Sequence, residues 1–150
     1  MPGHLIRRLQ QIAVSVFTER VTKAGYDLTP VQFAALSTIA GNPGLDQASL
    51  AGLIAYDRVT IGGVVDRLVQ KDLVDRTVSS RDRRARALLL TARGHKTLAI
   101  LVPVARRAQE DMTAGLTRDE ARQFLKLLKK TTEAGNALSR APWRPRAGAD

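Results

Sequence analysis

The chain has no cysteine and only two histidines. The lack of cysteine excludes disulfide bonds, thiolate metal sites and thiol-based redox sensing. His4 and His95 are too few for a histidine-rich metal site. No nucleophile with a neighbouring base and no glycine-rich phosphate loop is recognisable. We therefore expect a protein that is not an enzyme and that requires no cofactor or metal ion.

Long apolar runs and aromatic residues are scarce as well. No run approaches the ~18 apolar residues that span a bilayer, and residues 1–4 lack the pattern of a signal peptide. Both absences predict a cytoplasmic protein. Aromatic residues make up 4% of the chain, which argues against an RNA-binding module because such modules usually stack aromatic side chains on bases.

Positive charge, by contrast, is abundant. The 150 residues include 24 Lys and Arg against 14 Asp and Glu, a formal net charge of +10, and 44% of them are hydrophobic. This is one domain's worth of chain, with enough apolar residues to build a core. The surplus of positive charge predicts a polyanionic partner, with nucleic acid as the first candidate. Arginines are concentrated within residues 81–86, which favours a local contact with nucleic acid over a diffuse basic surface.

Residues 46–91 show the pattern of a helix-turn-helix followed by a β-hairpin. A short capped helix over 46–55 precedes a break at 56–58. In the second helix, apolar residues recur at the i, i+3, i+4, i+7 spacing of one buried face, namely Ile61, Val64, Val65 and Leu68. An arginine-rich hairpin tip at 79–84 and a strand at 87–90 follow. A helix suited to the major groove beside a cationic hairpin suited to the minor groove predicts a reader of duplex DNA.

Further helices are predicted over residues 4–24 and 30–40, from Ala92 to beyond Met112, and after Thr117. The long helix after the hairpin is apolar on two sides, so it needs more cover than its own small domain offers, and we expect Pro103 to bend it. We therefore expect the first helix and the last two to pair with a second copy of the chain, since a helix-turn-helix that reads a palindrome uses two-fold symmetry. A compact monomeric bundle with an appended hairpin is the alternative.

The segment from Val64 to Gly94 resembles the MarR family of winged helix-turn-helix transcriptional regulators, and the resemblance extends over residues 4–138. The matching letters are VVDRL at 64–68, LV at 73–74, DRR at 82–84, LT at 90–91 and Gly94. In the family this pattern marks the recognition helix, the wing and the start of the long dimerisation helix. The residue after Lys71 is usually glycine there, and Asp72 can also occupy a left-handed helix end at modest cost.

The predicted fold is mainly α-helical with a small β-wing. Residues 29–91 would form the winged helix-turn-helix that binds DNA, and both chain ends, 1–28 and 92–138, would form a helical dimerisation region. Residues 139–150 are rich in Pro, Arg, Gly and Ala, and we expect a flexible tail there. The opening at 2–11 resembles a subgroup that controls the breakdown of aromatic acids such as hydroxybenzoates and hydroxynicotinates.

Two groups of residues are candidates for DNA contacts. On the hairpin tip, Asp82 can hold the guanidinium of Arg84 and direct it into the minor groove. Arginine is favoured where the minor groove is narrow. The alternative is that Arg84 is a solvated loop residue. The remaining hairpin arginines are expected to contact phosphates or to stay in solvent: Arg81, Arg83 and Arg86. The recognition helix is expected to begin at an Asp57 cap and to present these candidates away from its buried face: Arg58, Thr60, Gly62, Gly63 and Arg67.

Two alternatives stay open on the recognition helix. Gly62 and Gly63 each cost about 1 kcal/mol inside a helix relative to alanine. They let the backbone approach either bases and phosphates or a neighbouring helix. Arg67 either contacts DNA or pairs with a carboxylate of the protein.

A polar seam on the first helix is the candidate effector site. It places His4, Arg8, Gln11 and Ser15 along one edge, beside an apolar face that includes Leu5. A cation and hydrogen-bonding groups at the rim of an apolar region suit an aromatic carboxylate. An ordinary solvated helix edge is the alternative. The family resemblance implies an effector pocket between the dimerisation helices and the DNA-binding lobe. The residues expected to form its walls are Phe33, Leu36 and Arg58.

Together these patterns predict a cytoplasmic homodimeric repressor that binds a pseudo-palindromic operator in double-stranded DNA. A small aromatic acid would release it from the operator. A DNA-binding regulator without any ligand is one alternative. A basic adaptor whose hairpin binds an acidic protein surface is another, and a steep salt dependence of DNA binding separates it from the regulators.

Overall fold

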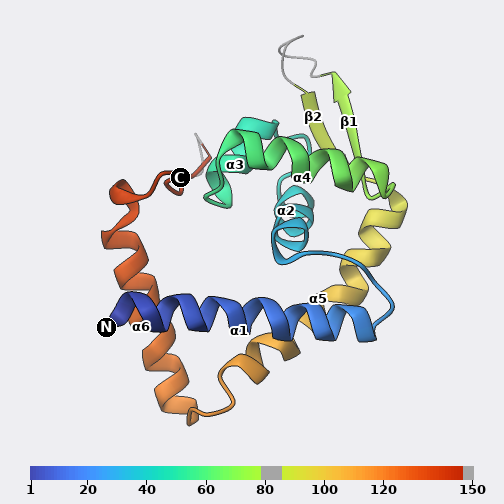
Figure 1. The fold of residues 1–150 in the computed structure, drawn as a ribbon. Helices are drawn as coiled ribbons and strands as arrows, with labels where there is room; N and C mark the ends of the chain where they lie inside the picture. Colours follow the sequence, from blue (N-terminus) through green and yellow to red (C-terminus); the bar gives the residue numbers. More distant parts are fainter. Residues whose placement is uncertain (79–85, 147–150) are drawn as a thin grey trace. The chain divides into compact units, whose positions relative to one another are not determined.

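The computed structural model describes residues 1–78 and 86–146. In chain order its elements are α1 (Pro2–Lys23), α2 (Pro30–Gly41), α3 (Gln47–Leu53), α4 (Arg58–Gln70), β1 (Val74–Val78), β2 (Arg86–Leu90), α5 (Ala92–Met112), α6 (Arg118–Ala134) and a 3-10 helix (Asn136–Leu138) (Figure 1). This confirms the prediction of a mainly helical fold with a small β-wing. The chain forms two compact units.

The first unit contains α1, α6 and most of α5. α1 ends as its sequence predicts, because Gly25 has a φ of +83°, a left-handed conformation that glycine adopts without penalty. The N–H groups of Gly25 and Tyr26 return to the carbonyls of Thr22 (2.9 Å) and Val21 (3.1 Å), which is the Schellman arrangement of a helix end. α5 is continuous, with Pro103 inside it.

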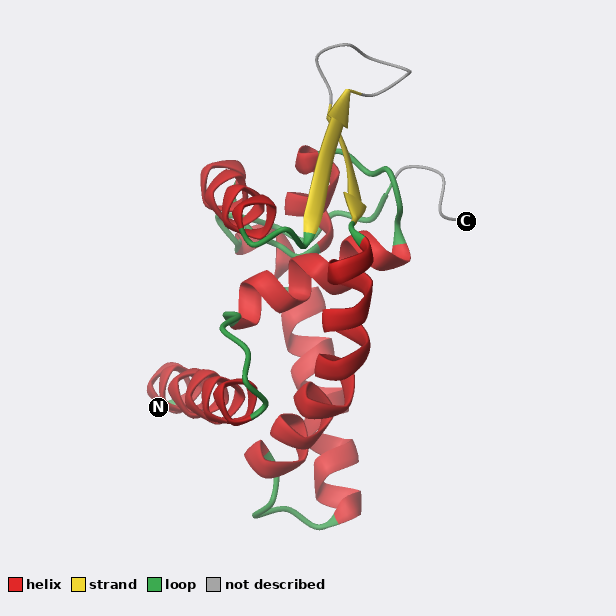
Figure 2. Ribbon diagram, turned by 90° about the vertical axis from the view of Figure 1, so that its right-hand side faces the viewer, coloured by secondary structure: helices red, strands yellow, loops and turns green. Residues whose placement is uncertain are grey.

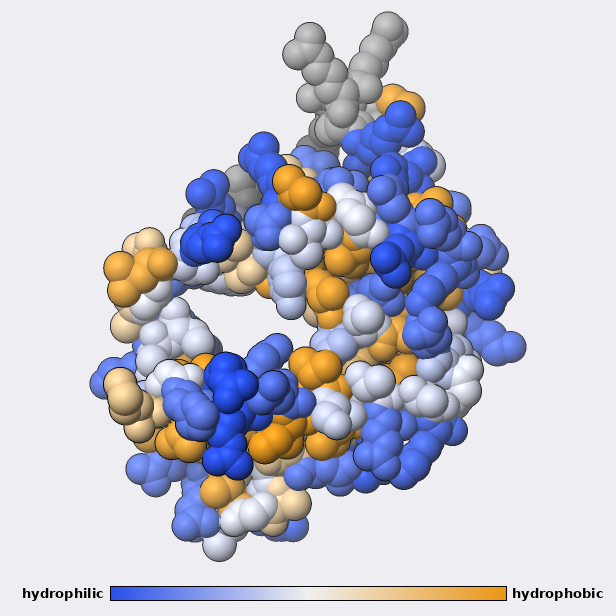
Figure 3. Space-filling view, in the orientation of Figure 1, coloured by the Kyte–Doolittle hydropathy of each residue, from blue (hydrophilic) through white to orange (hydrophobic). Residues whose placement is uncertain are grey.

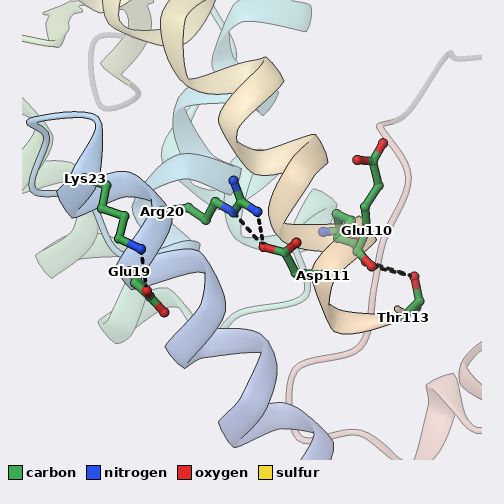
Figure 4. Close-up of polar contacts among 7 residues, drawn as sticks. Glu19, Arg20, Lys23, Glu110, Asp111 and Thr113 are labelled. Atoms are coloured by element: carbon green, nitrogen blue, oxygen red, sulfur yellow. Dashed lines mark hydrogen bonds and ion pairs between the residues drawn. The ribbon is translucent and has the colours of Figure 1, made fainter. Parts of the chain in front are cut away.

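An ion pair joins α1 to α5 within this unit. Arg20 Nε donates to Asp111 Oδ2 at 2.6 Å, and Nη2 of the same guanidinium lies 2.6 Å from that oxygen (Figure 4). One turn along α1, Lys23 Nζ donates to Glu19 Oε1 at 2.7 Å (Figure 4). This bond lowers the pKa of the Glu19 carboxyl. The exposed pairs contribute little stability individually, and the first joins residues of α1 and α5 that are remote in sequence.

The helices of the first unit expose much apolar surface. On α1, Leu5 is 60% exposed and Ile12 46%, and orange side chains lie among blue ones along this helix in Figure 3. α6 buries none of its residues, and Leu125 is 66% exposed. Exposed apolar patches of this kind mark sites of association.

The second unit contains the predicted helix-turn-helix. Asp46 caps α3 by accepting the Ser49 N–H at 2.6 Å, and this bond lowers the pKa of the Asp46 carboxyl. A bend of 110° separates α3 from α4, within the range for helix-turn-helix motifs. Ala55 has a φ of +54° in the turn. The stripe predicted to be buried on α4 is buried throughout: Ile61, Val64, Val65 and Leu68.

The strands of the hairpin pair antiparallel, with Val74 opposite Leu90 and Val78 opposite Arg86 (yellow in Figure 2). The loop before α3 joins the outer side of β2, where the Gly44 N–H donates to the Leu88 carbonyl at 2.9 Å. This bond anchors the wing to the helical core. Its tip, residues 79–85, lies outside the described residues.

A tight junction connects the end of α4, the wing and the start of α5. Asp72 has a φ of +57°, so it adopts the left-handed conformation expected for this position. Thr91 Oγ1 donates to the Asp72 carbonyl (2.7 Å) and accepts the Gly94 N–H (2.9 Å). The Leu73 carbonyl accepts the Thr91 N–H at 3.1 Å. A Cβ on Gly94 would lie 2.0 Å from that same carbonyl oxygen, so only glycine fits.

The C-terminal residues differ from the expected flexible tail. Residues 139–146 lie against α3, where the Arg144 N–H donates to the Gly52 carbonyl at 2.8 Å. Ser139 Oγ accepts the Ala141 N–H at 3.2 Å. These bonds hold a segment whose composition alone indicated disorder.

No single helix in the described parts of the chain is long and apolar enough to cross a membrane. Only α3 and α4 taken together meet the criteria of length and composition, and the 110° bend lies between them.

Candidate nucleic-acid interface

The first turn of α4 presents an exposed surface. Asp57 caps the helix by accepting the Thr60 N–H (2.8 Å) and the Thr60 hydroxyl (2.7 Å). These bonds lower the pKa of the Asp57 carboxyl, so the group stays ionised at neutral pH. Arg58 is exposed beside the cap. The capping bonds use the hydroxyl proton of Thr60, so its oxygen is left as an acceptor only.

Val59 was missed by the sequence analysis. It is 88% exposed next to Arg58, on the opposite side of α4 from the buried stripe. An exposed aliphatic side chain on a recognition helix suits the methyl group of thymine. Its exposure could have been predicted from the sequence, because Val59 falls outside the i, i+3, i+4, i+7 series of buried residues that begins at Ile61.

The two helical glycines have different surroundings. A Cβ on Gly62 would lie 3.5 Å from Nε2 of Gln47 on α3, an ordinary contact, whereas a Cβ on Gly63 would meet no atom within 4 Å. Close packing within the protein therefore does not require glycine at position 63. The open space at Gly63 is compatible with the close approach of another molecule.

An ion pair joins α4 to the wing. Arg76 Nη2 on β1 pairs with Asp66 Oδ1 on α4. Arg67 is exposed and makes no ion pair with the described residues, so the alternative of an internal pair finds no partner among them. Arg86 is exposed at the start of β2. The other predicted wing contacts, Arg81 to Arg84, lie outside the described residues.

The predicted effector residues are distributed over both units. The seam residues His4, Arg8, Gln11 and Ser15 are all exposed on α1, as expected for one helical edge. Gln11 Oε1 accepts a bond from Arg7 Nη1 at 3.1 Å, so its partner is Arg7. In the second unit, Phe33 is half-buried on α2, Leu36 is completely buried and Arg58 is exposed.

Comparison with known proteins identifies the family to which the exposed α4 and the wing belong. The profile of the MarR family matches residues 26–85. The transcriptional repressor NicR of Pseudomonas putida is 31% identical over 132 residues, which cover 88% of this chain and 82% of the relative. The chain belongs to the MarR family. It is therefore a transcriptional regulator with a winged helix-turn-helix fold, in which α4 is the recognition helix and β1–β2 the wing.

Two solved structures of MarR-type regulators are similar along most of the chain. Bordetella bronchiseptica BpsR, whose DNA binding is regulated by 6-hydroxynicotinic acid, has a TM-score of 0.83 and 27% identity, covering 89% of this chain and 94% of that one. The repressor CouR, bound to a 23-mer DNA duplex, has a TM-score of 0.80 and 31% identity, covering 88% and 92%. This MarR-family chain thus shares its fold with a DNA-bound repressor and with an acid-responsive regulator.

Proposed function

We propose that this MarR-family protein is a cytoplasmic homodimeric repressor, without enzymatic activity, that binds a pseudo-palindromic operator and is released by a small aromatic carboxylic acid. The exposed first turn of α4, with Arg58 and Val59 in solvent and Gly63 open, is the observation that carries DNA binding. The similarity to CouR and BpsR supports the operator and the acid, respectively.

Within this proposal, α4 enters the major groove and the wing the adjacent minor groove. The major-groove residues are Arg58, Thr60, Gly62, Gly63 and Arg67. Arg84 enters the minor groove, oriented by Asp82. The other wing arginines contact phosphates: Arg81, Arg83 and Arg86.

Gly63→Ala tests the close approach of α4 to DNA. The substitution meets no protein atom, so it should raise the free energy of unfolding by up to about 1 kcal/mol through helix propensity. It should nevertheless weaken operator binding by about 1–3 kcal/mol, the scale of a specific contact. Thermal melts and fluorescence anisotropy measure the two effects. Gly41→Ala, at another open helical glycine, is the control and should leave operator affinity unchanged. Undiminished affinity of Gly63→Ala would place this part of α4 away from the DNA.

Release by the acid requires a difference in affinity between two dimer geometries. A ligand that binds both geometries equally shifts nothing, however tightly it binds. The acid must therefore favour a geometry in which the two recognition helices no longer match successive major grooves. We assign its carboxylate to Arg8 on α1, with His4, Gln11 and Ser15 as hydrogen-bonding neighbours.

Arg8→Ala tests this assignment, and Arg7→Ala is the matched control. Both arginines are exposed on α1, but Arg7 bonds to Gln11. An operator is first selected from a pool of random duplexes, and 4-hydroxybenzoate and 6-hydroxynicotinate are titrated into the complex. Arg8→Ala should bind the operator normally and need roughly 10- to 100-fold more acid for release, because a charge-assisted hydrogen bond contributes about 1.5–3 kcal/mol.

Three other results would change the proposal. Equal acid concentrations for wild type, Arg7→Ala and Arg8→Ala would make Arg8 an ordinary solvated residue. Failure of every aromatic acid to release the wild type would leave a regulator without this ligand. Failure of the wild type to bind any duplex would remove DNA as the partner and favour an adaptor for acidic proteins.

A further inference from the structure

The last described residues form a strap across α3. The C-terminal strap (residues 135–146) begins with the 3-10 helix and closes on itself at Asn136. The Asn136 side chain accepts the Trp143 N–H (2.7 Å) and donates to the Trp143 carbonyl (3.0 Å). The next residue, Arg144, donates its N–H to the Gly52 carbonyl on α3 at 2.8 Å. The bonds of Trp143 thus close the strap on itself, and the bond of Arg144 attaches it to α3.

Gly52 makes this docking possible. A Cβ at position 52 would lie 3.1 Å from Cβ and 3.3 Å from the carbonyl oxygen of Arg144, which is tighter than an ordinary contact. A glycine inside a helix costs about 1 kcal/mol relative to alanine. Its presence in α3 is therefore explained by the close approach of the strap.

Docking brings three arginines to the surface of the helix-turn-helix. Arg140, Arg144 and Arg146 are exposed and make no ion pair with any described residue. Arg140 and Arg144 line a hollow together with Arg58, at the first turn of the recognition helix. Arg144 and Arg146 line a second hollow beside Asp46 at the start of α3. The strap therefore adds positive charge beside Arg58, at hollows that also contain the carboxylates of Asp57 and Asp46.

The strap adds little to the core. Leu138 is 90% exposed and Trp143 51% exposed, so little apolar surface is removed from water, and the hydrophobic contribution to stability is correspondingly small. Its chemistry is that of exposed guanidinium groups, whose planar donors match phosphate oxygens.

We propose that the C-terminal strap is a second DNA contact, in which Arg140, Arg144 and Arg146 bind backbone phosphates flanking the base pairs read by α4. This inference rests on the proposed function, because it takes α4 to lie in the major groove. When the second helix of a helix-turn-helix lies in the groove, the first crosses the sugar-phosphate backbone. Arginines docked on α3 then face phosphates, and their contacts are independent of base sequence.

The test compares two full-length double variants that each remove two positive charges per chain. Arg144→Ala with Arg146→Ala removes the strap charges, and Lys126→Ala with Lys130→Ala removes exposed charges from α6. Affinity for the selected operator and for a scrambled duplex is measured between 50 and 200 mM salt. A dimer without four phosphate contacts should have a log–log salt slope less steep by roughly 3 to 4. Its fall in affinity across this range should then be about 100-fold smaller than that of the wild type.

The same loss should occur on the operator and on the scrambled duplex, because phosphate contacts carry no sequence information. Gly52→Gln retains every arginine but places a Cβ 3.1 Å from Cβ of Arg144, closer than an ordinary contact, with a long side chain beyond it. It should move the salt slope in the same direction as the strap double variant, while a strong helix former replaces glycine and maintains α3.

Each outcome decides the proposal. A salt slope for the strap variant equal to that of the α6 control would overturn the strap contact while leaving operator binding by α4 intact. A normal slope for Gly52→Gln, with a reduced slope for the strap variant, would show that docking on α3 is not required and would overturn the fixed geometry. Absence of duplex binding by the wild type would overturn the strap contact together with the proposed function.

Discussion

Replacing Gly94 with alanine should lower the free energy of unfolding by roughly 3 kcal/mol, the upper range for overpacking a tight site. The new Cβ would lie 2.0 Å from the Leu73 carbonyl oxygen and 3.2 Å from Cγ of Leu90. The carbonyl cannot move freely, because it accepts the Thr91 N–H. The strain therefore falls on the junction that joins α4, the wing and α5. Operator binding should weaken with it, since this junction positions the wing.

Urea denaturation with the tryptophan signal and circular dichroism measures this loss. Gly63→Ala provides the matched control, because it adds the same methyl group to a helix at a position with open space. The two variants should move the unfolding midpoint in opposite directions. If Gly94→Ala unfolds at the wild-type urea concentration, the first turn of α5 can move away from Leu73 without cost, and the junction is not rigid.

Replacing Leu125 and Leu128 with aspartate should convert the homodimer that we propose into a monomer. The two residues are 66% and 38% exposed on α6, and each buried leucine contributes about 1.5–3 kcal/mol. A symmetric interface contains every substitution twice, so four charges would enter it. Operator affinity should fall by more than roughly 100-fold, because a monomer contacts a single half-site.

Light scattering coupled to size exclusion gives the oligomeric state, and anisotropy gives the affinity. Lys126→Ala with Lys130→Ala changes two exposed residues of the same helix and should remain dimeric. If the double variant remains a dimer, the interface does not include this face of α6. Self-association would then not explain its exposed leucines.

Local patterns in the sequence were sufficient for the secondary structure around the interface. The spacing of Ile61, Val64, Val65 and Leu68 identified the buried face of α4, because helical period and burial are linked directly. Asp57 and Gly25 identified helix ends, because capping and a left-handed stop depend on a few adjacent residues.

Contacts between distant parts of the chain were not predictable in this way. The composition of residues 139–146 indicated a flexible tail, and only their position beside Gly52 shows a docked segment. The pairing of Arg20 with Asp111 is equally remote in sequence. The reason is physical, since periodicity reports on one helix at a time and carries no information about which surface a later segment will meet.

The ion pair between Asp66 and Arg76 has a consequence for how regulation can work. It joins the recognition helix to the first strand of the wing, and the loop at Gly44 joins the second strand to the helical core. Within one protomer the two groove-binding elements are therefore expected to move as a single rigid body. In the homodimer that we propose, the effector would then release the operator by altering the distance and angle between the two rigid bodies. Operators with half-sites moved by a single base pair should accordingly resemble the effector in their influence on affinity.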